Sequence, residues 1–431
     1  MLKVGFSRVD VTPPLGSYVS GYFHERFAQG VLDPLELNAL ACNDGENTVL
    51  LIIADFIGID KTYCDIIREK ISARVSIPAD QIMLTSLHQH TSVCVAVHDT
   101  YTRNDVFYME SLYRKYCDVA RMALDDMREA TAEISAGETA EPIAFIRKYL
   151  MTDGTIIGHP FGRRDEIVKR LEDADNTVRL VRFKREGAKD VAFVNFCTHP
   201  DVVKGDWLSA DWPGAARRYV EHDLEDVSCL VLTGVQGDSN HSDYLTEPKK
   251  GYEHSLYMGR TIADVVLRLW DTGKEMKETR VGERIGIVSL PTRTDGIEDY
   301  EASKKIVDTL KVTPNAIVTT AAERARARRI VEMQGAPLFQ KLPVTVLRIG
   351  DLFVVGFGGE PFTDYAREVR RGVPDTEIFT ACCANGYEGY LPSKEDFTRE
   401  TYESSASHFP SDMEDHCVNM ALDLIDEIKR A

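Results

Sequence analysis

Residues 84–92 read LTSLHQHTS, which joins an apolar run to two histidines. The run from Gln81 to Leu87 predicts a strand that ends at the rim of a sheet, where α/β folds place their ligands. His88 and His90 are two residues apart, so an extended backbone would turn both imidazoles to the same side. Such a pair suits a metal or a hydrolytic centre, although many histidine pairs are merely surface or core residues.

Outward from this stretch, strand-like runs alternate with amphipathic helical runs. Continuous apolar runs predict strands buried on both faces, and a period near 3.6 predicts helices. The predicted strands are 48–54, 178–183, 190–196, 230–235, 344–349, 352–357 and 378–382. The predicted helices are 61–75, 106–129, 254–270, 299–310, 319–334 and 412–430. We expect one α/β domain over 1–431, with a mixed β-sheet core covered by helices and a weak internal boundary near 273–278.

The composition excludes several classes of function. The 431 residues are 43% hydrophobic and 28% charged, which is ordinary for a soluble globular protein. A net charge of −18 argues against nucleic acid or anionic membrane surfaces as partners. No run is long and apolar enough for membrane insertion. The nine scattered cysteines form no C-x-x-C, and the start shows no leader pattern, so we expect a cytoplasmic protein with reduced thiols.

Four further polar fragments follow predicted strands. His199 ends 193–199, a turn-rich Gly237-Asp238-Ser239 block follows 230–235, Glu360 follows 352–357, and two tyrosines follow 378–382. Two imidazoles and a carboxylate make a catalytic zinc set with an open position for water. Each fragment alone is more often structural, and their joint occurrence favours a metal centre.

The ordered fragments resemble the neutral/alkaline, non-lysosomal ceramidases, and more closely their short bacterial relatives of undefined substrate. The matching stretches are 4–14 (VGFSRVDVTPP), Gly21-Tyr22, Asp33-Pro34-Leu35 and Ile53-Ala54-Asp55. The resemblance implies a ceramidase-like catalytic domain, here with no C-terminal β-domain of the kind that true ceramidases carry.

The resemblance also implies a Zn²⁺ site. The family's Thr-His-Thr-His-Ser segment is similar to residues 86–92, where its first histidine, the first ligand, falls on His88. Its second histidine falls on His90 and lies beside the substrate. The Ala-Thr-His-Pro segment makes His199 the second ligand. The Gly-Glu after an apolar strand makes Glu360 the third, and the Asn-x-Tyr-x-x-Tyr segment makes Tyr390 the fourth.

Other matches suggest roles around the metal. Arg147 falls near the family's arginine at the substrate carbonyl, where a guanidinium could hold an oxyanion or a carboxylate. Tyr402 falls where the family has a tyrosine that faces the scissile amide. The substrate-binding residues that we expect are Asp211, which could also be a helix N-cap, Asn240 and Tyr387.

The departures from the family argue against ceramide itself. The family's Gly-Asp-Val-Ser-Pro-Asn reads Gly237-Asp238-Ser239-Asn240-His241 in this chain, so Ser239 or Asn240 stands in place of the serine that contacts the substrate. We therefore expect a small polar substrate, with its identity set by pocket loops such as 94–106 and 242–252.

The sequence supports three hypotheses. The leading one is a zinc-dependent hydrolase that cleaves an amide bond, with His90 as the base and Arg147 and Tyr402 beside the oxyanion. A serine esterase built on Gly237-Asp238-Ser239 is the second. The third is a non-catalytic protein that binds a metal or a small molecule. The sequence leaves open whether the protein forms a homo-oligomer.

Overall fold

Two β-sheets lie face to face in the computed structural model, which describes residues 1–22, 24–96, 106–160, 162–312, 320–399 and 401–431. The larger sheet has nine strands, with β18 (Lys274–Glu275) paired to β8. Its other strands, in order, are β16 (Val227–Thr233), β14 (Asp190–Phe196), β13 (Thr177–Arg185), β8 (Arg128–Glu138), β1 (Lys3–Asp10), β3 (Glu36–Asn43), β4 (Thr48–Ala54) and β6 (Ile82–Ser86). The smaller sheet runs β19 (Val281–Pro291), β20 (Phe339–Ile349), β21 (Leu352–Phe357) and β23 (Glu377–Ala381).

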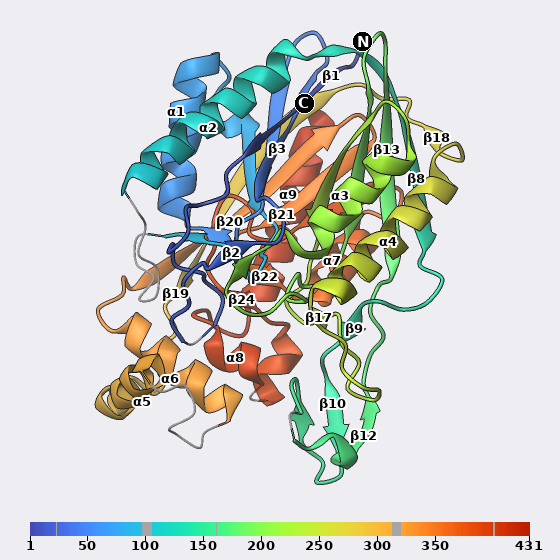
Figure 1. Cartoon of the computed structure of the whole chain (residues 1–431). Helices are drawn as coiled ribbons and strands as arrows, with labels where there is room; N and C mark the ends of the chain where they lie inside the picture. Colours follow the sequence, from blue (N-terminus) through green and yellow to red (C-terminus); the bar gives the residue numbers. More distant parts are fainter. Residues whose placement is uncertain (23, 97–105, 161, 313–319, 400) are drawn as a thin grey trace.

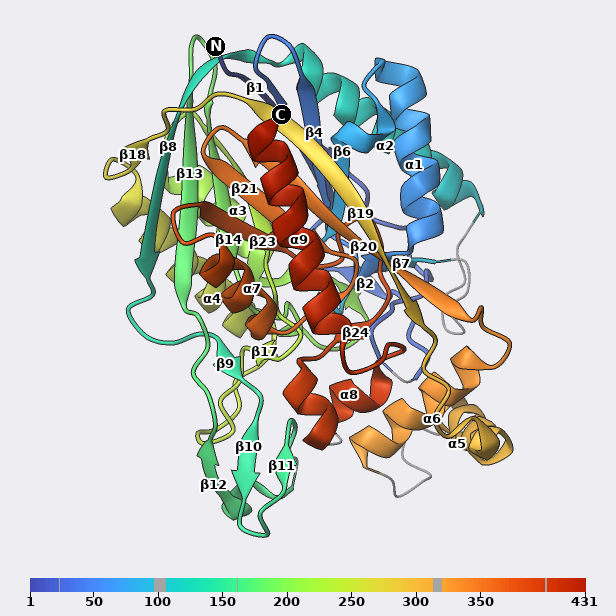
Figure 2. The ribbon, with the colours of Figure 1, turned by 180° about the vertical axis from the view of Figure 1, so that it is seen from behind.

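Helices cover the outer face of each sheet, so the fold has four layers (Figures 1 and 2). The large sheet is covered by α1 (Lys61–Val75), α2 (Val106–Asp125), α3 (Asp211–Asp223) and α4 (Tyr252–Leu269). The small sheet is covered by α7 (Thr363–Gly372) and α9 (Met413–Arg430). Both sheets are mixed, because β4–β6, β14–β16 and β21–β23 are parallel pairs and the other pairs within these two sheets are antiparallel.

Strand β4 is apolar at almost every position, rather than alternating between apolar and polar residues, because of the way it packs. Leu50, Ile52 and Ala54 pack under the α1–α2 layer, whereas Val49, Leu51 and Ile53 pack into the space between the two sheets. A strand that is buried on both faces needs apolar side chains at every position. The expected mixed core covered by helices is therefore confirmed, with two sheets rather than one.

Smaller elements gather at one end of the molecule, opposite the two termini (Figure 1). Two further helices, α5 (Tyr300–Val312) and α6 (Ala321–Met333), lie at this end with α8 (Tyr402–Ala406), and a small sheet projects beside them. The short strands are β2 (Gly30–Val31), β5 (Gly58–Ile59), β7 (Cys94–Val95), β9 (Phe145–Ile146), β10 (Tyr149–Met151), β11 (Ile156–Ile157), β12 (Ile167–Arg170), β15 (Trp207–Leu208), β17 (Ser239–Asn240), β22 (Glu360–Pro361) and β24 (Tyr390–Leu391).

Most predicted elements match the structure, although several of their boundaries differ. The helix expected over 106–129 ends at Asp125, and the chain from Arg128 is strand β8. The strand predicted over 81–87, directly before the two histidines, ends at Ser86 instead of Leu87. The segment 273–278 holds β18, and Met276 packs in the core between the sheets. Residue 319 of one predicted helix and residues 97–105 of one pocket loop lie outside the described residues.

None of the described helices combines the length and apolar character needed to cross a membrane. None of the nine cysteines, all of which lie in the described part of the chain, forms a disulfide bond.

Candidate metal centre and cavity

The polar fragments meet where β6, β14, β16, β21 and β23 end. His88 does not continue strand β6, because its φ of 71° lies in the left-handed region, which a residue with a side chain seldom adopts. The expectation that His88 and His90 share one face of an extended strand was therefore wrong. The turn after Ser86 still brings the two rings together, with their centroids 5.0 Å apart.

His88 and His199 converge on one carboxylate. Glu360 Oε2 lies 3.2 Å from His88 Nε2 and 3.1 Å from His199 Nε2, and all three side chains are buried. Ligands at ~2.0–2.2 Å from a tetrahedral zinc ion lie roughly 3.3 Å from each other. Both distances from the Glu360 carboxylate therefore match the spacing of two ligands on one zinc ion.

Backbone carbonyls orient both imidazoles. His88 Nδ1 lies 2.6 Å from the carbonyl oxygen of Ile57, and His199 Nδ1 lies 2.7 Å from that of Gln236. Each Nδ1 must donate to its carbonyl, which leaves the Nε2 lone pair for a metal. Burial lowers the pKa of His199, which keeps its ring neutral. Burial also works against the charged form of His88, but the Glu360 carboxylate outweighs it and raises the pKa of His88.

His90 lies beside this centre in a different environment. One ligand atom each of His88, His90 and His199 lie within 4.8 Å of one another, so the three could also share an ion. The ring nitrogens of His90 have no hydrogen bond to the described residues, and Nδ1 lies 3.7 Å from Asp201 Oδ1. Burial lowers the pKa of His90 well below its usual value, which keeps the ring neutral.

The short parallel pair β22–β24 places Tyr390, and Tyr387 lies three residues before it. Tyr390 is in register with Glu360 on this pair. Tyr387 donates to Glu360 Oε1 at 3.2 Å, and the Tyr390 hydroxyl accepts a hydrogen bond from Arg147 Nη2 at 3.2 Å. Burial raises the pKa of Tyr390, and the nearby guanidinium opposes that rise. The roles of Tyr387 at the substrate and Tyr390 at the metal remain predictions.

Arg147 is fixed on several sides. Its Nη2 also donates to the Gly237 carbonyl at 2.5 Å, and its Nε pairs with Glu403 Oε1 at 2.9 Å. Nη1 lies 3.4 Å from His159 Nε2.

The Tyr402 ring packs edge-on against that of Tyr390, with centroids 5.6 Å apart. The structure thus brings Arg147 and Tyr402 to the centre, and their action on a substrate carbonyl remains a prediction.

Asp211 and the 239–240 pair make local contacts. Asp211 Oδ2 accepts from the N–H groups of Val202 and Val203, both at 2.9 Å, and so braces the chain after His199. Asn240 Oδ1 accepts from its neighbour's N–H at 2.7 Å. Ser239 Oγ donates to the Cys197 carbonyl at 3.1 Å, so its proton is engaged by backbone rather than by an imidazole. The roles of Asp211 and Asn240 in binding a substrate remain predictions.

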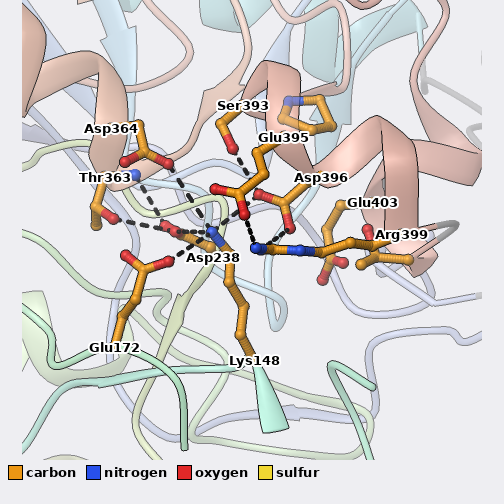
Figure 3. A network of polar contacts seen from close by, with 12 residues as sticks. Lys148, Glu172, Asp238, Thr363, Asp364, Ser393, Glu395, Asp396, Arg399 and Glu403 are labelled. Atoms are coloured by element: carbon orange, nitrogen blue, oxygen red, sulfur yellow. Dashed lines mark hydrogen bonds and ion pairs between the residues drawn. The ribbon is translucent and has the colours of Figure 1, made fainter. Parts of the chain in front are cut away.

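A buried lysine ties together the segments that carry the site (Figure 3). Lys148 is 3% exposed in its side chain, and its ammonium lies 2.9 Å from Asp396, 3.5 Å from Asp238 and 3.9 Å from Asp364. Burial opposes its charge, but the carboxylates of Asp238 and Asp396 raise its pKa. Asp238 follows Gly237, Asp364 follows β22 and Asp396 follows β24. One ammonium therefore joins the neighbourhoods of Arg147, Glu360 and Tyr390.

A cavity of about 660 Å³ opens from the centre toward α6 and the segment after it. Its wall at the centre includes His88, His90, Glu360 and Tyr390, and Tyr402 also lines it. The far wall is formed by α6 with residues 334–337 and 340, and it carries charged side chains. The cavity is large enough for a small molecule and has polar groups at both ends.

Sequence reasoning missed four residues near the centre. Asp201 and Glu403 contact His90 and Arg147, and each stands next to a recognised fragment: Asp201 two residues after His199, Glu403 directly after Tyr402. Tyr22 donates to Asp201, and His159 contacts Arg147 from a different segment. Adjacency could have indicated the first two. His159 carries no such signal, because only the folded chain brings it to Arg147.

The protein thus combines a four-layer α/β fold with a candidate metal site, formed at the strand ends by two histidines and a glutamate. Among solved structures, the neutral ceramidase from Pseudomonas aeruginosa shares this fold with a TM-score of 0.75 and 14% sequence identity, over 100% of this chain and 75% of that chain. A structure of a ceramidase complexed with C2 gives the same TM-score and coverage at 12% identity. No protein-family model and no curated protein matches the sequence. At these identities the likeness shows the fold alone.

Proposed function

We propose that the protein is a zinc-dependent hydrolase that cleaves an amide bond in a small polar molecule. The observation that carries the proposal is the convergence of His88 Nε2 and His199 Nε2 on the Glu360 carboxylate at the wall of the cavity. Tyr390 is the fourth ligand in this account, supported by its register with Glu360. The ceramidase fold of the similar structures supports amide cleavage.

A bound zinc ion supplies a water of lowered pKa and polarises the substrate carbonyl. His90 is the base in our account, because a neutral, buried imidazole without a hydrogen-bond partner among the described residues can take the water's proton on a ring nitrogen. It can then return that proton to the leaving amine. Asp201, 3.7 Å from His90 Nδ1, favours the charged ring that forms in between.

Arg147 acts through Tyr390 and through its own charge. Its hydrogen bond to the phenol oxygen orients that oxygen toward the centre, and the guanidinium places a positive charge where an oxyanion would develop. Glu403 and the Gly237 carbonyl hold the guanidinium in place, so little reorganisation is needed during the reaction.

The substrate that fits this account is a small polar molecule rather than a sphingolipid, because the far wall of the cavity carries charged side chains. A cytoplasmic location is part of the proposal, and the nine free thiols support a reducing compartment.

A screen of zinc-loaded protein against small N-acyl amines and N-acyl amino acids tests the proposal, with release of the free amine as the readout. We expect turnover that a chelator abolishes and added Zn²⁺ restores. The isosteric variant Glu360→Gln should lose both zinc and turnover. Turnover that survives complete metal removal would contradict the proposal, and zinc binding without any turnover would favour a binding protein.

A further inference from the structure

The cations that line the cavity each have a carboxylate of their own. Lys61, Arg328 and Arg329 form ion pairs with side chains of the described residues. The pairs are Lys61–Asp65 at 2.5 Å, Arg328–Glu332 at 2.6 Å and Arg329–Asp295 at 3.0 Å. Each of these three cations therefore already has a carboxylate partner within the protein.

The carboxylates that line the same cavity are not all paired. Glu332 also contacts His408, and Glu360 faces the two histidines of the centre. Asp60 accepts from the Tyr63 N–H at 2.8 Å as the N-cap of α1. Glu388 has neither an ion pair within 4.0 Å nor a side-chain hydrogen bond among the described residues, and only its backbone N–H is bonded, to the Gly358 carbonyl at 2.8 Å.

Glu388 lies in the wall of the cavity. It is half-buried, and His408, Asp60 and Lys61 line the same cavity. It directly follows Tyr387, whose hydroxyl donates to Glu360. A half-buried carboxylate without a partner is costly, and a ligand cation that pairs with it removes that cost.

The lining of the cavity is also partly apolar. Ile57, Val331, Met333 and Pro337 line the cavity, and its volume of about 660 Å³ leaves room for a chain of methylene groups. A molecule with an amide at one end and a positive charge at the other would therefore use both the centre and Glu388.

We propose that the substrates of this site are amides that carry a cationic group, an ammonium or a guanidinium, separated from the amide by an apolar spacer, and that Glu388 binds the cation. This inference rests on the proposed function, because the amide is held at the His88–His199–Glu360 centre. It makes Glu388 a specificity-determining residue.

Binding of matched hydroxamic acids to the zinc-loaded protein tests the inference without relying on turnover, since a hydroxamate anchors on a zinc ion. The series consists of ω-amino, ω-methyl and ω-carboxy alkanehydroxamic acids of four to eight carbons, and calorimetry gives each Kd. We expect the best ω-amino ligand to bind about tenfold tighter than its ω-methyl match, the size of one charge-assisted contact.

Glu388→Gln should reduce this ratio to about one, whereas Glu186→Gln, the same change at an exposed glutamate, should leave it unchanged. Equal binding of the ω-amino and ω-methyl ligands, tighter binding of the ω-carboxy ligand, or a ratio that survives Glu388→Gln would each overturn the inference while leaving the zinc centre standing. Failure of every hydroxamate to bind would instead overturn the proposed function, and this inference with it.

Discussion

Glu360 and Tyr390 stand directly opposite each other on β22 and β24, a parallel pair of only two residues per strand. The Glu360 N–H donates to the Gly389 carbonyl at 2.9 Å, and the Phe362 N–H donates to the Leu391 carbonyl at 3.1 Å. Backbone register thus sets the separation of these two proposed ligands. The pair ties the end of β21 to the loop after β23, and the site depends on both.

Gly237 permits this arrangement, because a Cβ at that position would lie 2.3 Å from the Glu360 carbonyl oxygen. Gly237→Ala must push β22 away, so we expect zinc affinity to fall roughly 10–100-fold, as for other changes in the surroundings of metal ligands. Competition with a chromophoric chelator measures this. Gly282→Ala is the matched control, since nothing lies within 4 Å of its added Cβ. Unchanged zinc affinity in Gly237→Ala would contradict this prediction, because it would show that β22 can shift without disturbing the metal site.

Lys148 is predicted to be needed for stability as well as for the site. Lys148→Met leaves Asp238 buried without its cation and leaves Asp396 with Arg399 alone, which costs about 3–5 kcal/mol of unfolding free energy. Urea denaturation with the exposed Lys169→Met as control measures the difference. A loss below 1 kcal/mol would mean that water enters the network and replaces the ammonium.

Ser239 separates the zinc mechanism from the serine-esterase alternative. Its hydroxyl donates to the Cys197 carbonyl, so Ser239→Ala should cost about 1 kcal/mol in stability and leave most of the turnover. A fluorophosphonate should not label the protein, whereas a chelator should inactivate it. Abolished turnover in a Ser239→Ala protein that keeps its zinc would favour the esterase mechanism.

His241 should make the fold sensitive to acid. Burial lowers the pKa of His241 to about 3, below the value of about 6.5 in an unfolded chain. Between these values the unfolded state binds a proton that the folded state does not, so stability falls as the pH drops below 6.5. The loss reaches about 2 kcal/mol by pH 5. His241→Gln should reduce this dependence by about 2 kcal/mol in urea titrations from pH 7 to 5. His222→Gln, at a side chain that is 83% exposed, should not.

Much of the architecture follows from local patterns, and much of the site does not. The apolar run 48–54 predicts its strand because both faces of β4 are buried, and the motif fragments could be found because each follows such a strand. The left-handed turn at His88 was not predictable from alternation, since it depends on contacts with the Ile57 and Phe56 carbonyls. The Lys148 network and the approach of His159 to Arg147 join distant segments. No local pattern encodes such contacts.

The central claim is that His88 holds the metal and His90 moves the proton. Zinc content by plasma mass spectrometry, measured on His88→Ala and His90→Ala beside the unchanged protein, tests it most directly. We predict that His88→Ala loses its zinc, whereas His90→Ala retains it while turnover falls by about 10²–10⁴-fold. Full zinc content in His88→Ala would contradict the account, and loss of zinc in His90→Ala would assign the metal to the three histidines instead.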